Sequence, residues 1–226
     1  SFFIVSSAAE PTIVSMICPD EMREKIIAAA KQRFFHYGYA KTTMAELAGD
    51  CDMSPGNLYR YFPGKLDIAE EICRRASIQT AEELQRILEE PGLSARERLW
   101  RFLLQDLRST FETLEEDPKI VDMAQIVTAE RPSFHNEGLK RERDVIAQIL
   151  DMGVKAGEFR CDDTAACAEF IQAATMRFSY PQLFSRLSLE RLEFELEGVF
   201  KLITDGLACP LKAAAEEKAR LATQDA

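Results

Sequence analysis

A short segment near residue 60 carries amide, guanidinium and phenol groups that could contact DNA. Leu58 and Phe62 are four residues apart, so a helix over this segment would bury both on one face. The helix would then turn Asn57, Arg60 and Tyr61 outward. Asparagine and arginine can hydrogen-bond base edges, and a tyrosine hydroxyl can donate to phosphate. The segment therefore predicts a helix that reads DNA.

Two short helices must position these side chains. Thr43 and Glu46 have the spacing of a capping box, which predicts a helix that begins there and runs to about residue 49. After a tight turn, Ser54 is a good N-cap and Pro55 suits the first helical position of a second helix. Gly56 has no side chain, so it lets the backbone of this second helix lie close to a duplex.

A longer helix precedes this pair. Asp20 can cap it, and Tyr37-Gly38 ends it where glycine suits a left-handed residue. Two short helices braced by a longer one form a helix-turn-helix, in which the second short helix enters the major groove.

These motifs resemble a known family. The stretches Thr42–Ala48 and Cys51–Lys65 are similar to the signature of TetR-type repressors, and the resemblance extends over about Arg23 to Ile72. One difference is Asp52, which stands where the family usually has glycine in the turn. Aspartate tolerates a left-handed backbone, but its carboxylate near phosphate would weaken binding.

The resemblance implies a set of DNA contacts. In that family the residues matching Thr43, Tyr59 and Lys65 contact phosphate, and those matching Pro55, Gly56, Asn57 and Tyr61 lie on the groove side. We therefore expect the following residues to contact DNA: Thr42, Thr43, Ser54, Pro55, Gly56, Asn57, Tyr59, Arg60, Tyr61 and Lys65.

Charge is distributed unevenly along the chain. The whole sequence has 28 Lys and Arg against 38 Asp and Glu, a net charge of −10. Between residues 21 and 66 there are seven cations and five anions, which gives +2, so the remainder carries 21 against 33, or −12. DNA binding needs local positive potential, so this uneven distribution points to the N-terminal part of the chain.

Helical periodicity runs through the rest of the chain, and no alternating strand pattern interrupts it. We expect an all-α protein of about nine helices, with later helices at about 65–88, 94–116, 118–129, 133–156, 163–179 and 188–208. The predicted organisation is a flexible leader (1–19), a helix-turn-helix domain (20–66), a helical domain for ligand binding and dimerisation (67–208) and a solvated tail (209–226).

A homodimer is expected because two recognition helices match a palindromic operator in double-stranded DNA. TetR-like proteins pair their last two helices in a four-helix bundle. The predicted interface combines small and apolar residues of these helices: Ala165, Ala168, Ala173, Leu196, Val199, Phe200 and Ile203. The alternative is that this apolar stripe packs inside one subunit.

The resemblance also implies a pocket for a small-molecule inducer in the C-terminal domain. Occupation of the pocket would pivot the helix that begins at Lys65 and spread the two recognition helices. Candidate lining residues are Trp100, Leu104, Phe111, Met123, Phe134, His135, Met176, Arg177 and Phe178. Aromatic and Met residues at helical spacing also form ordinary cores, so no particular inducer is assigned.

Other classes of protein have less support in the sequence. The two histidines, His36 and His135, are far apart, and no HExxH, GxSxG or glycine-rich phosphate loop is present. Asp50-x-Asp52-x-Ser54 begins like a calcium loop but lacks its later glycine and glutamate. We expect neither an enzyme, a metal site nor a cofactor. A helical interaction module that does not bind DNA remains an alternative.

The cysteines and the hydropathy pattern indicate the cellular compartment of the protein. Six cysteines without a CxxC pair indicate mostly buried, reduced thiols and a cytoplasmic protein. Cys161 and Cys167, six residues apart, leave a thiol-based redox sensor as a narrower alternative. No stretch is long and apolar enough to predict membrane insertion, and the apolar start of the chain lacks the basic residues of a signal peptide.

Overall fold

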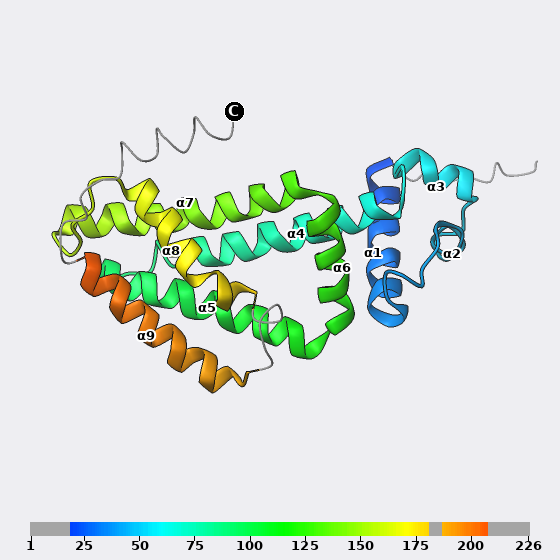
Figure 1. The fold of residues 1–226 in the computed structure, drawn as a ribbon. Helices are drawn as coiled ribbons and strands as arrows, with labels where there is room; N and C mark the ends of the chain where they lie inside the picture. Colours follow the sequence, from blue (N-terminus) through cyan, green and yellow to red (C-terminus); the bar gives the residue numbers. More distant parts are fainter. Residues whose placement is uncertain (1–18, 181–186, 208–226) are drawn as a thin grey trace, which may run out of the picture.

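The computed structural model describes residues 19–180 and 187–207, which form nine helices and no strands (Figure 1). The all-α prediction is thus confirmed for this part of the chain. The helices are α1 (Pro19–Tyr37), α2 (Met44–Asp50), α3 (Pro55–Tyr61), α4 (Lys65–Arg86), α5 (Ala95–Glu116), α6 (Pro118–Glu130), α7 (Pro132–Ala156), α8 (Thr164–Ser179) and α9 (Leu189–Leu207). The predicted leader and tail lie outside the described residues, except for Pro19, which begins α1.

The molecule has two parts joined by α4. Helices α1, α2 and α3 form a small head at one end, and α4 runs from this head into a bundle with α5, α7, α8 and α9 (Figure 1). Helix α6 stands across the end of the bundle, next to α1, and packs against α1, α4, α5 and α7. The head therefore meets the bundle through two elements, α4 and α6.

Local sequence signals explain the boundaries of the head helices. The capping box predicted for Thr43 and Glu46 is present, because the Thr43 hydroxyl accepts from the Glu46 amide and the Glu46 carboxylate accepts from the Thr43 amide. The Ser54 hydroxyl accepts from the amide of Asn57 at 3.2 Å and caps α3. Asp52 has φ of +58°, so it adopts the left-handed backbone predicted for it.

The apolar core of the head extends beyond the three head helices. This head core consists of Ile26, Ile27, Ala30, Phe34, Leu47, Ala48, Cys51, Leu58, Phe62, Ile68, Ala69, Ile72, Met123, Val127 and Phe134. Met123 and Val127 belong to α6, and Phe134 belongs to the first turn of α7. The apolar interior of the head thus continues into the second part of the chain.

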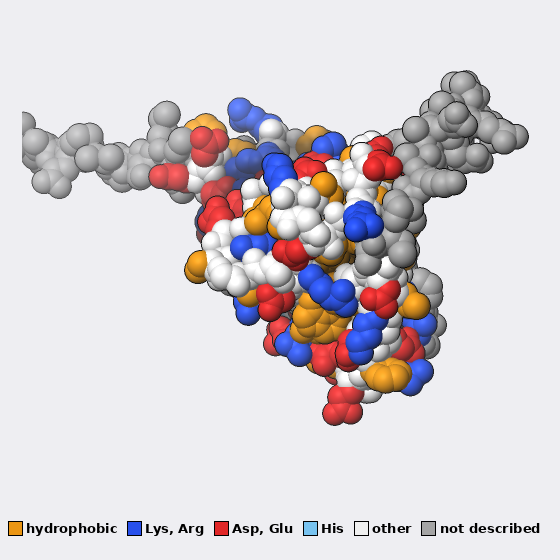
Figure 2. Space-filling view, turned by 90° about the vertical axis from the view of Figure 1, so that its left-hand side faces the viewer, with side chains coloured by type: hydrophobic (Ala, Val, Ile, Leu, Met, Phe, Trp, Pro, Cys, Tyr) orange, Lys and Arg blue, Asp and Glu red, His pale blue; other side chains and the backbone are white. Residues whose placement is uncertain are grey.

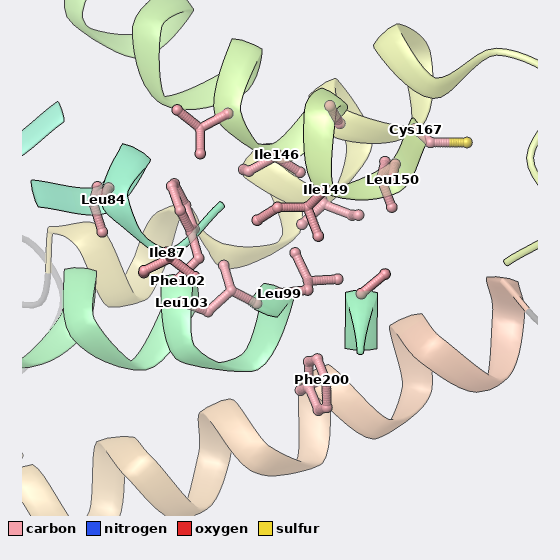
Figure 3. Close-up of a cluster of buried hydrophobic side chains, with 14 of the residues drawn as sticks. Leu84, Ile87, Leu99, Phe102, Leu103, Ile146, Ile149, Leu150, Cys167 and Phe200 are labelled. Atoms are coloured by element: carbon pink, nitrogen blue, oxygen red, sulfur yellow. The ribbon is translucent and has the colours of Figure 1, made fainter. Parts of the chain in front are cut away.

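A separate bundle core fills the space between α4, α5, α7, α8 and α9 (Figure 3). Leu99, Ile149 and Leu150 are fully buried there, and Phe200 of α9 packs against it from the opposite side. Gly153 is needed at one contact, because a Cβ atom there would lie only 2.1 Å from the Phe159 ring. This core holds the bundle helices α4, α5, α7, α8 and α9 in fixed positions relative to one another.

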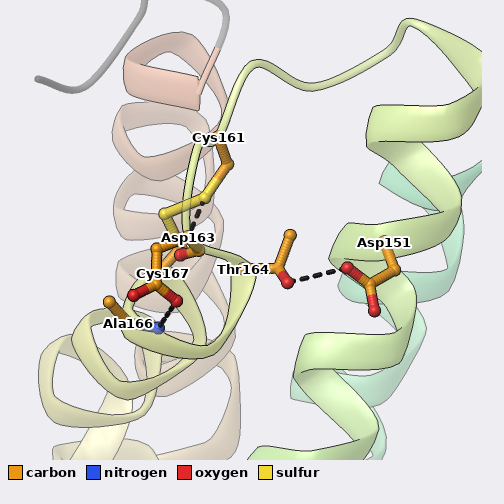
Figure 4. The surroundings of a disulfide bond; sticks show 6 residues. All are labelled: Asp151, Cys161, Asp163, Thr164, Ala166 and Cys167. Carbon is orange, nitrogen blue, oxygen red and sulfur yellow. Dashed lines mark hydrogen bonds between the residues drawn. A yellow bond between two sulfur atoms is a disulfide. The ribbon is translucent and has the colours of Figure 1, made fainter. Parts of the chain in front are cut away.

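Two of the cysteines are paired. Cys161 and Cys167 form a disulfide at the start of α8 (Figure 4). The expectation of reduced thiols is therefore wrong for this pair, because the loop into α8 folds back and brings the two sulfurs together. Cys51 and Cys73 are free, and Cys18 and Cys209 lie outside the described residues. Among the described helices, none is long and apolar enough to cross a membrane.

Candidate nucleic-acid interface

The outer face of the head carries the side chains predicted to read DNA. Leu58 and Phe62 are buried in the head core at 0% and 1% exposure, as their spacing predicted. Arg60 and Tyr59 are exposed and Asn57 is half-buried. Ser54, Pro55 and Gly56, which begin α3, are also exposed. The start and outer side of α3 therefore form an open polar surface.

Two residues of the predicted set are placed differently. Thr42 is 1% exposed, and its hydroxyl donates to the carbonyl oxygen of Gly38 at 3.0 Å. It closes the turn after α1, so its side chain cannot reach DNA. Tyr61 lies three residues after buried Leu58, and its ring is half-buried against the head core.

Lys65, predicted to contact phosphate, has other partners. Its ammonium donates to the carbonyl oxygens of Tyr39 and Thr42, both at 2.7 Å, and lies 4.2 Å from the centre of the Tyr39 ring. Burial lowers the pKa of this ammonium. The charge of Lys65 holds the loop between α1 and α2 in place.

The carboxylates of the helix-turn-helix are compensated by α1. Asp50 accepts two hydrogen bonds from Arg33, at 2.6 and 2.9 Å, which lower its pKa. Asp52, expected to weaken phosphate binding, accepts from Lys25 at 3.3 Å. These contacts reduce the negative potential close to α3.

Lys41 was missed by the sequence reasoning. It is exposed in the loop just before α2. Of the cations between α1 and α3, Lys41 and Arg60 have no hydrogen bond, ion pair or ring contact with any residue that the structure describes. A lysine directly before the Thr42-Thr43 pair was the available signal.

The bundle contains a cavity of about 660 Å³ between α4, α5, α6, α7 and the end of α8. Of the residues predicted to line an inducer pocket, the cavity includes Met123, Phe134, His135 and Met176. The site thus lies against α6 and the first turn of α7.

The other five predicted pocket residues do not line this cavity. Trp100 packs on Phe200, with ring centres 5.1 Å apart, and both Phe111 and Phe178 contribute to the bundle core. Arg177 pairs with Glu195 at 3.1 Å, and Leu104 is half-buried outside the cavity wall. Apolar character alone could not distinguish core from cavity.

Polar residues line one side of the cavity and were also missed. Asp106 accepts a hydrogen bond of 2.6 Å from the Ser179 hydroxyl, and Glu142 of α7 lies nearby with Tyr180. On α5, Asp106, Thr110 and Thr113 recur at helical spacing and all face the cavity. Such a polar stripe on the inner side of a helix was the signal in the sequence.

Two family models match the chain. Residues 26–72 match the model described as bacterial regulatory proteins of the tetR family, and residues 95–200 match a tetracyclin repressor-like C-terminal domain. The chain belongs to the TetR family. It is therefore a DNA-binding transcriptional regulator and not an enzyme.

Similar proteins agree with this assignment. The HTH-type transcriptional repressor KstR2 of Mycolicibacterium smegmatis is 25% identical over 169 residues, which are 70% of this chain and 77% of that protein. A transcriptional regulator from Cytophaga hutchinsonii has a TM-score of 0.61 at 25% identity, covering 82% of this chain and 98% of that one. FadR of Thermus thermophilus, solved with lauroyl-CoA, has a TM-score of 0.60 at 22% identity, with coverages of 85% and 98%.

The last two helices of this TetR-family chain present a different surface from the one predicted. Ala168, Leu196 and Phe200 were expected at a dimer interface, but they are buried in the subunit's own bundle core. Val199 and Ile203 are half-buried against the same core. Ala168, Leu196 and Phe200 are therefore occupied by packing within the subunit, as the alternative stated above expected.

The apolar residues that remain accessible lie on the outer side of the same helices. Phe170, Phe194 and Leu202 are 56%, 65% and 76% exposed. Ala165 and Ala173, two of the predicted small residues, are also exposed on α8. At the end of the bundle opposite the head, by contrast, acidic and basic side chains are interspersed over the surface (Figure 2).

Proposed function

We propose that this TetR-family chain is a cytoplasmic repressor that binds a palindromic operator as a homodimer and leaves it when a small molecule fills the bundle cavity. The observation that carries the proposal is shared packing between the cavity and the head. Met123 and Phe134 line the cavity and are also members of the head core. A ligand that displaces either side chain would therefore change the packing of the head core, to which Leu58 of the recognition helix α3 also belongs.

Polar contacts supplement this packing. The Lys119 ammonium at the start of α6 donates to the carbonyl oxygen of His36 at the end of α1, at 2.6 Å. Arg131, between α6 and α7, pairs with Asp67 and Glu70 of α4 at 3.3 and 3.0 Å. Because both routes start at α6, a shift of α6 would act on α1 and α4 together. A ligand acts only through its preference for one of the two arrangements.

DNA binding is proposed to rest on α3 and on the loop before α2. Arg60 and Asn57 would contact base edges, and Thr43, Tyr59 and Lys41 would contact phosphates. The hydroxyl of Thr43 is also engaged with Glu46, at 2.8 Å, but the residue is exposed. Two such heads would have to present α3 to successive major-groove faces about 34 Å apart.

The dimer is proposed to form through the exposed outer side of α8 and α9. Phe170, Phe194 and Leu202 supply apolar area, and Ala165 and Ala173 allow close approach. Aromatic side chains are enriched in the buried centre of protein interfaces.

Selection of bound fragments from the source genome, followed by fluorescence anisotropy, tests the proposal. Arg60→Ala should weaken binding to the selected fragment about 5- to 150-fold, because one lost base contact costs about 1 to 3 kcal/mol. The matched control is Arg96→Ala, an exposed arginine at the far end of α5, which should bind like the wild type. Equal affinity of the two variants, or no selected fragment at low salt, would favour an interaction module without DNA binding.

Redox sensing is a second candidate, favoured by the Cys161–Cys167 pair. Reduction would free the loop before α8 and loosen its packing next to α9, where Arg160 donates to the carbonyl oxygen of Leu207 at 2.9 Å. The test compares operator affinity of oxidised and reduced protein with that of Cys161→Ser. Identical affinities in all three would remove this candidate.

A further inference from the structure

The cavity holds two carboxyl groups close to one another. Asp106 lies on α5 and Glu142 on α7, and both line the cavity wall. Each has one short or moderate hydrogen bond: Asp106 with the Ser179 hydroxyl at 2.6 Å, and Glu142 with the Gln172 amide at 3.4 Å. A carboxylate can accept about four hydrogen bonds, so both retain acceptor capacity directed at the cavity.

No strong cation neutralises this pair inside the cavity. Among the described lining residues there is neither lysine nor arginine, and the one imidazole, His135, has its pKa lowered by burial, which favours its neutral form. Arg141, next to Glu142 in the sequence, is not itself a lining residue and donates to the lining residue Ser77 at 3.2 Å; its charge lowers the pKa of Glu142, but burial and the Asp106 charge raise that pKa by more. Arg177 is paired with Glu195 on α9.

The two carboxyl groups affect one another. Burial raises the pKa of Asp106, and burial together with the Asp106 charge raises the pKa of Glu142 to about 8. The Tyr180 phenol beside them also has a raised pKa, mainly from burial. Burial with little counter-charge disfavours ionisation of both carboxyl groups, so a ligand that brings a positive charge would be favoured in this cavity.

Apolar side chains also line the cavity. Helix α6 supplies Ile120, Val121 and Met123 together with the polar residues Gln125 and Thr128, and Phe134, Leu139 and Met176 add apolar surface from α7 and α8. Aromatic rings also flank the polar side, where His135 and Tyr180 have ring centres 5.8 Å apart. An ammonium group is attracted to ring faces as well as to carboxylates. The cavity thus has a polar acidic side and an apolar side next to the head core.

We propose that the cavity binds an amphiphilic organic cation, whose protonated amine lies between Asp106 and Glu142 and whose apolar part lies against α6. This inference rests on the proposed function, because it names the ligand class of the same cavity. A ligand with a carboxylate or phosphate at the same depth would place a negative charge beside two carboxyl groups whose own ionisation the cavity already disfavours. The apolar part would act on Met123 and Phe134, which with Ile72 are the buried residues that both line the cavity and belong to the head core.

Three compounds with one chain length test the head-group preference. Dodecylamine, dodecanoate and 1-dodecanol, each below its micelle concentration, are titrated into the purified protein by calorimetry at pH 8. We expect dodecylammonium to bind at least 10-fold more tightly than the other two compounds. Equal or tighter binding of dodecanoate would overturn the proposal.

Isosteric variants of the two carboxyl groups test whether they bind the ammonium group. Asp106→Asn and Glu142→Gln should each lower the affinity for dodecylammonium at least 10-fold and leave 1-dodecanol binding almost unchanged. Glu112→Gln, an exposed carboxylate on α5 outside the cavity, is the matched control and should bind like the wild type. If both cavity variants retain circular dichroism spectra and full affinity for dodecylammonium, the amine site is refuted.

Measuring operator release as well as ligand binding distinguishes a failure of the proposed amine site from a failure of the proposed repressor function. If dodecanoate or lauroyl-CoA releases the operator while dodecylammonium does not bind, the amine inference fails and the ligand-responsive repressor stands. If dodecylammonium binds with the predicted dependence on Glu142 but never releases the operator, the amine site stands and release through this cavity fails.

Discussion

The ammonium of Lys119 on α6 donates a hydrogen bond of 2.6 Å to the backbone carbonyl oxygen of His36 on α1. The two residues are 83 positions apart in the chain and join the bundle to the head. His36 precedes the loop that leads to α2, so this contact connects α6 with the start of the helix-turn-helix. This hydrogen bond is a second connection between bundle and head, in addition to the packing of Met123 and Phe134 in the head core.

Replacing Lys119 should weaken communication more than DNA binding. In Lys119→Met, we expect operator affinity within about twofold of wild type, because the residue is remote from α3. The dodecylammonium concentration for half-release should rise about fivefold, which corresponds to roughly 1 kcal/mol of coupling. Lys140→Met, which removes an exposed pair with Asp144 on α7, is the control. An unchanged release midpoint in Lys119→Met would show that packing alone carries the coupling.

Lys41 and Lys65 should behave differently in salt titrations. Lys41→Met is expected to reduce the slope of log affinity against log salt by about one unit, as loss of a phosphate contact does. Lys65→Met should leave the slope nearly unchanged and lower the stability of the head by about 1 to 3 kcal/mol, because two carbonyl oxygens lose their donor. A lowered slope in Lys65→Met would instead support the phosphate contact that the family resemblance implies.

Stability should depend on pH through Glu142. The folded protein keeps the Glu142 proton up to a pKa of about 8, whereas the unfolded chain loses it near 4.5. Its contribution is therefore most favourable below pH 4.5 and declines as the pH rises toward 8. Asp106, His135, Tyr180 and Arg141 surround the same group.

The difference between wild type and Glu142→Gln isolates this effect from other carboxyl groups. Thermal unfolding at pH 5 and pH 8 should show the wild type losing about 2 kcal/mol more than Glu142→Gln. This is less than the full shift would give, because a folded protein relaxes around a newly formed buried charge. Parallel pH profiles for the two proteins would contradict the burial argument.

Filling the cavity should mimic a ligand. Thr110 lines the cavity on α5, so Thr110→Trp would place a large ring against α6. We expect a folded protein whose operator affinity is at least 10-fold lower, whereas Glu112→Trp on the exposed side of α5 should bind normally. Wild-type affinity of a folded Thr110→Trp would separate the cavity from DNA release.

The outer face of α9 can be tested for dimerisation. Leu202→Glu, at a position with 76% exposure, should shift the protein to monomers in analytical ultracentrifugation and weaken operator binding. Ile78→Glu, at a position with 41% exposure on α4, should leave the oligomeric state unchanged. Monomeric wild-type protein at micromolar concentration would contradict the proposed dimer.

The sequence by itself determined the helices and the helix-turn-helix. Capping boxes, N-terminal prolines and breakers act over three or four residues, so the bounds of α2 and α3 could be read from Thr43, Glu46, Ser54 and Pro55. The burial of Leu58 and Phe62 followed from helical spacing alone.

Tertiary structure decided which polar and apolar groups are available. Thr42 and Lys65 have the residue types of DNA contacts, but the fold provides them with carbonyl partners from distant or neighbouring turns. Phe200 and Phe194 are equally apolar, and only the packing of α9 on α5 buries one and exposes the other. Asp106 and Glu142 are 36 positions apart, and the crossing of α5 and α7 makes them one site. Local signals fix helices because their hydrogen bonds are local, whereas sites depend on helix packing, which sums many long-range contacts.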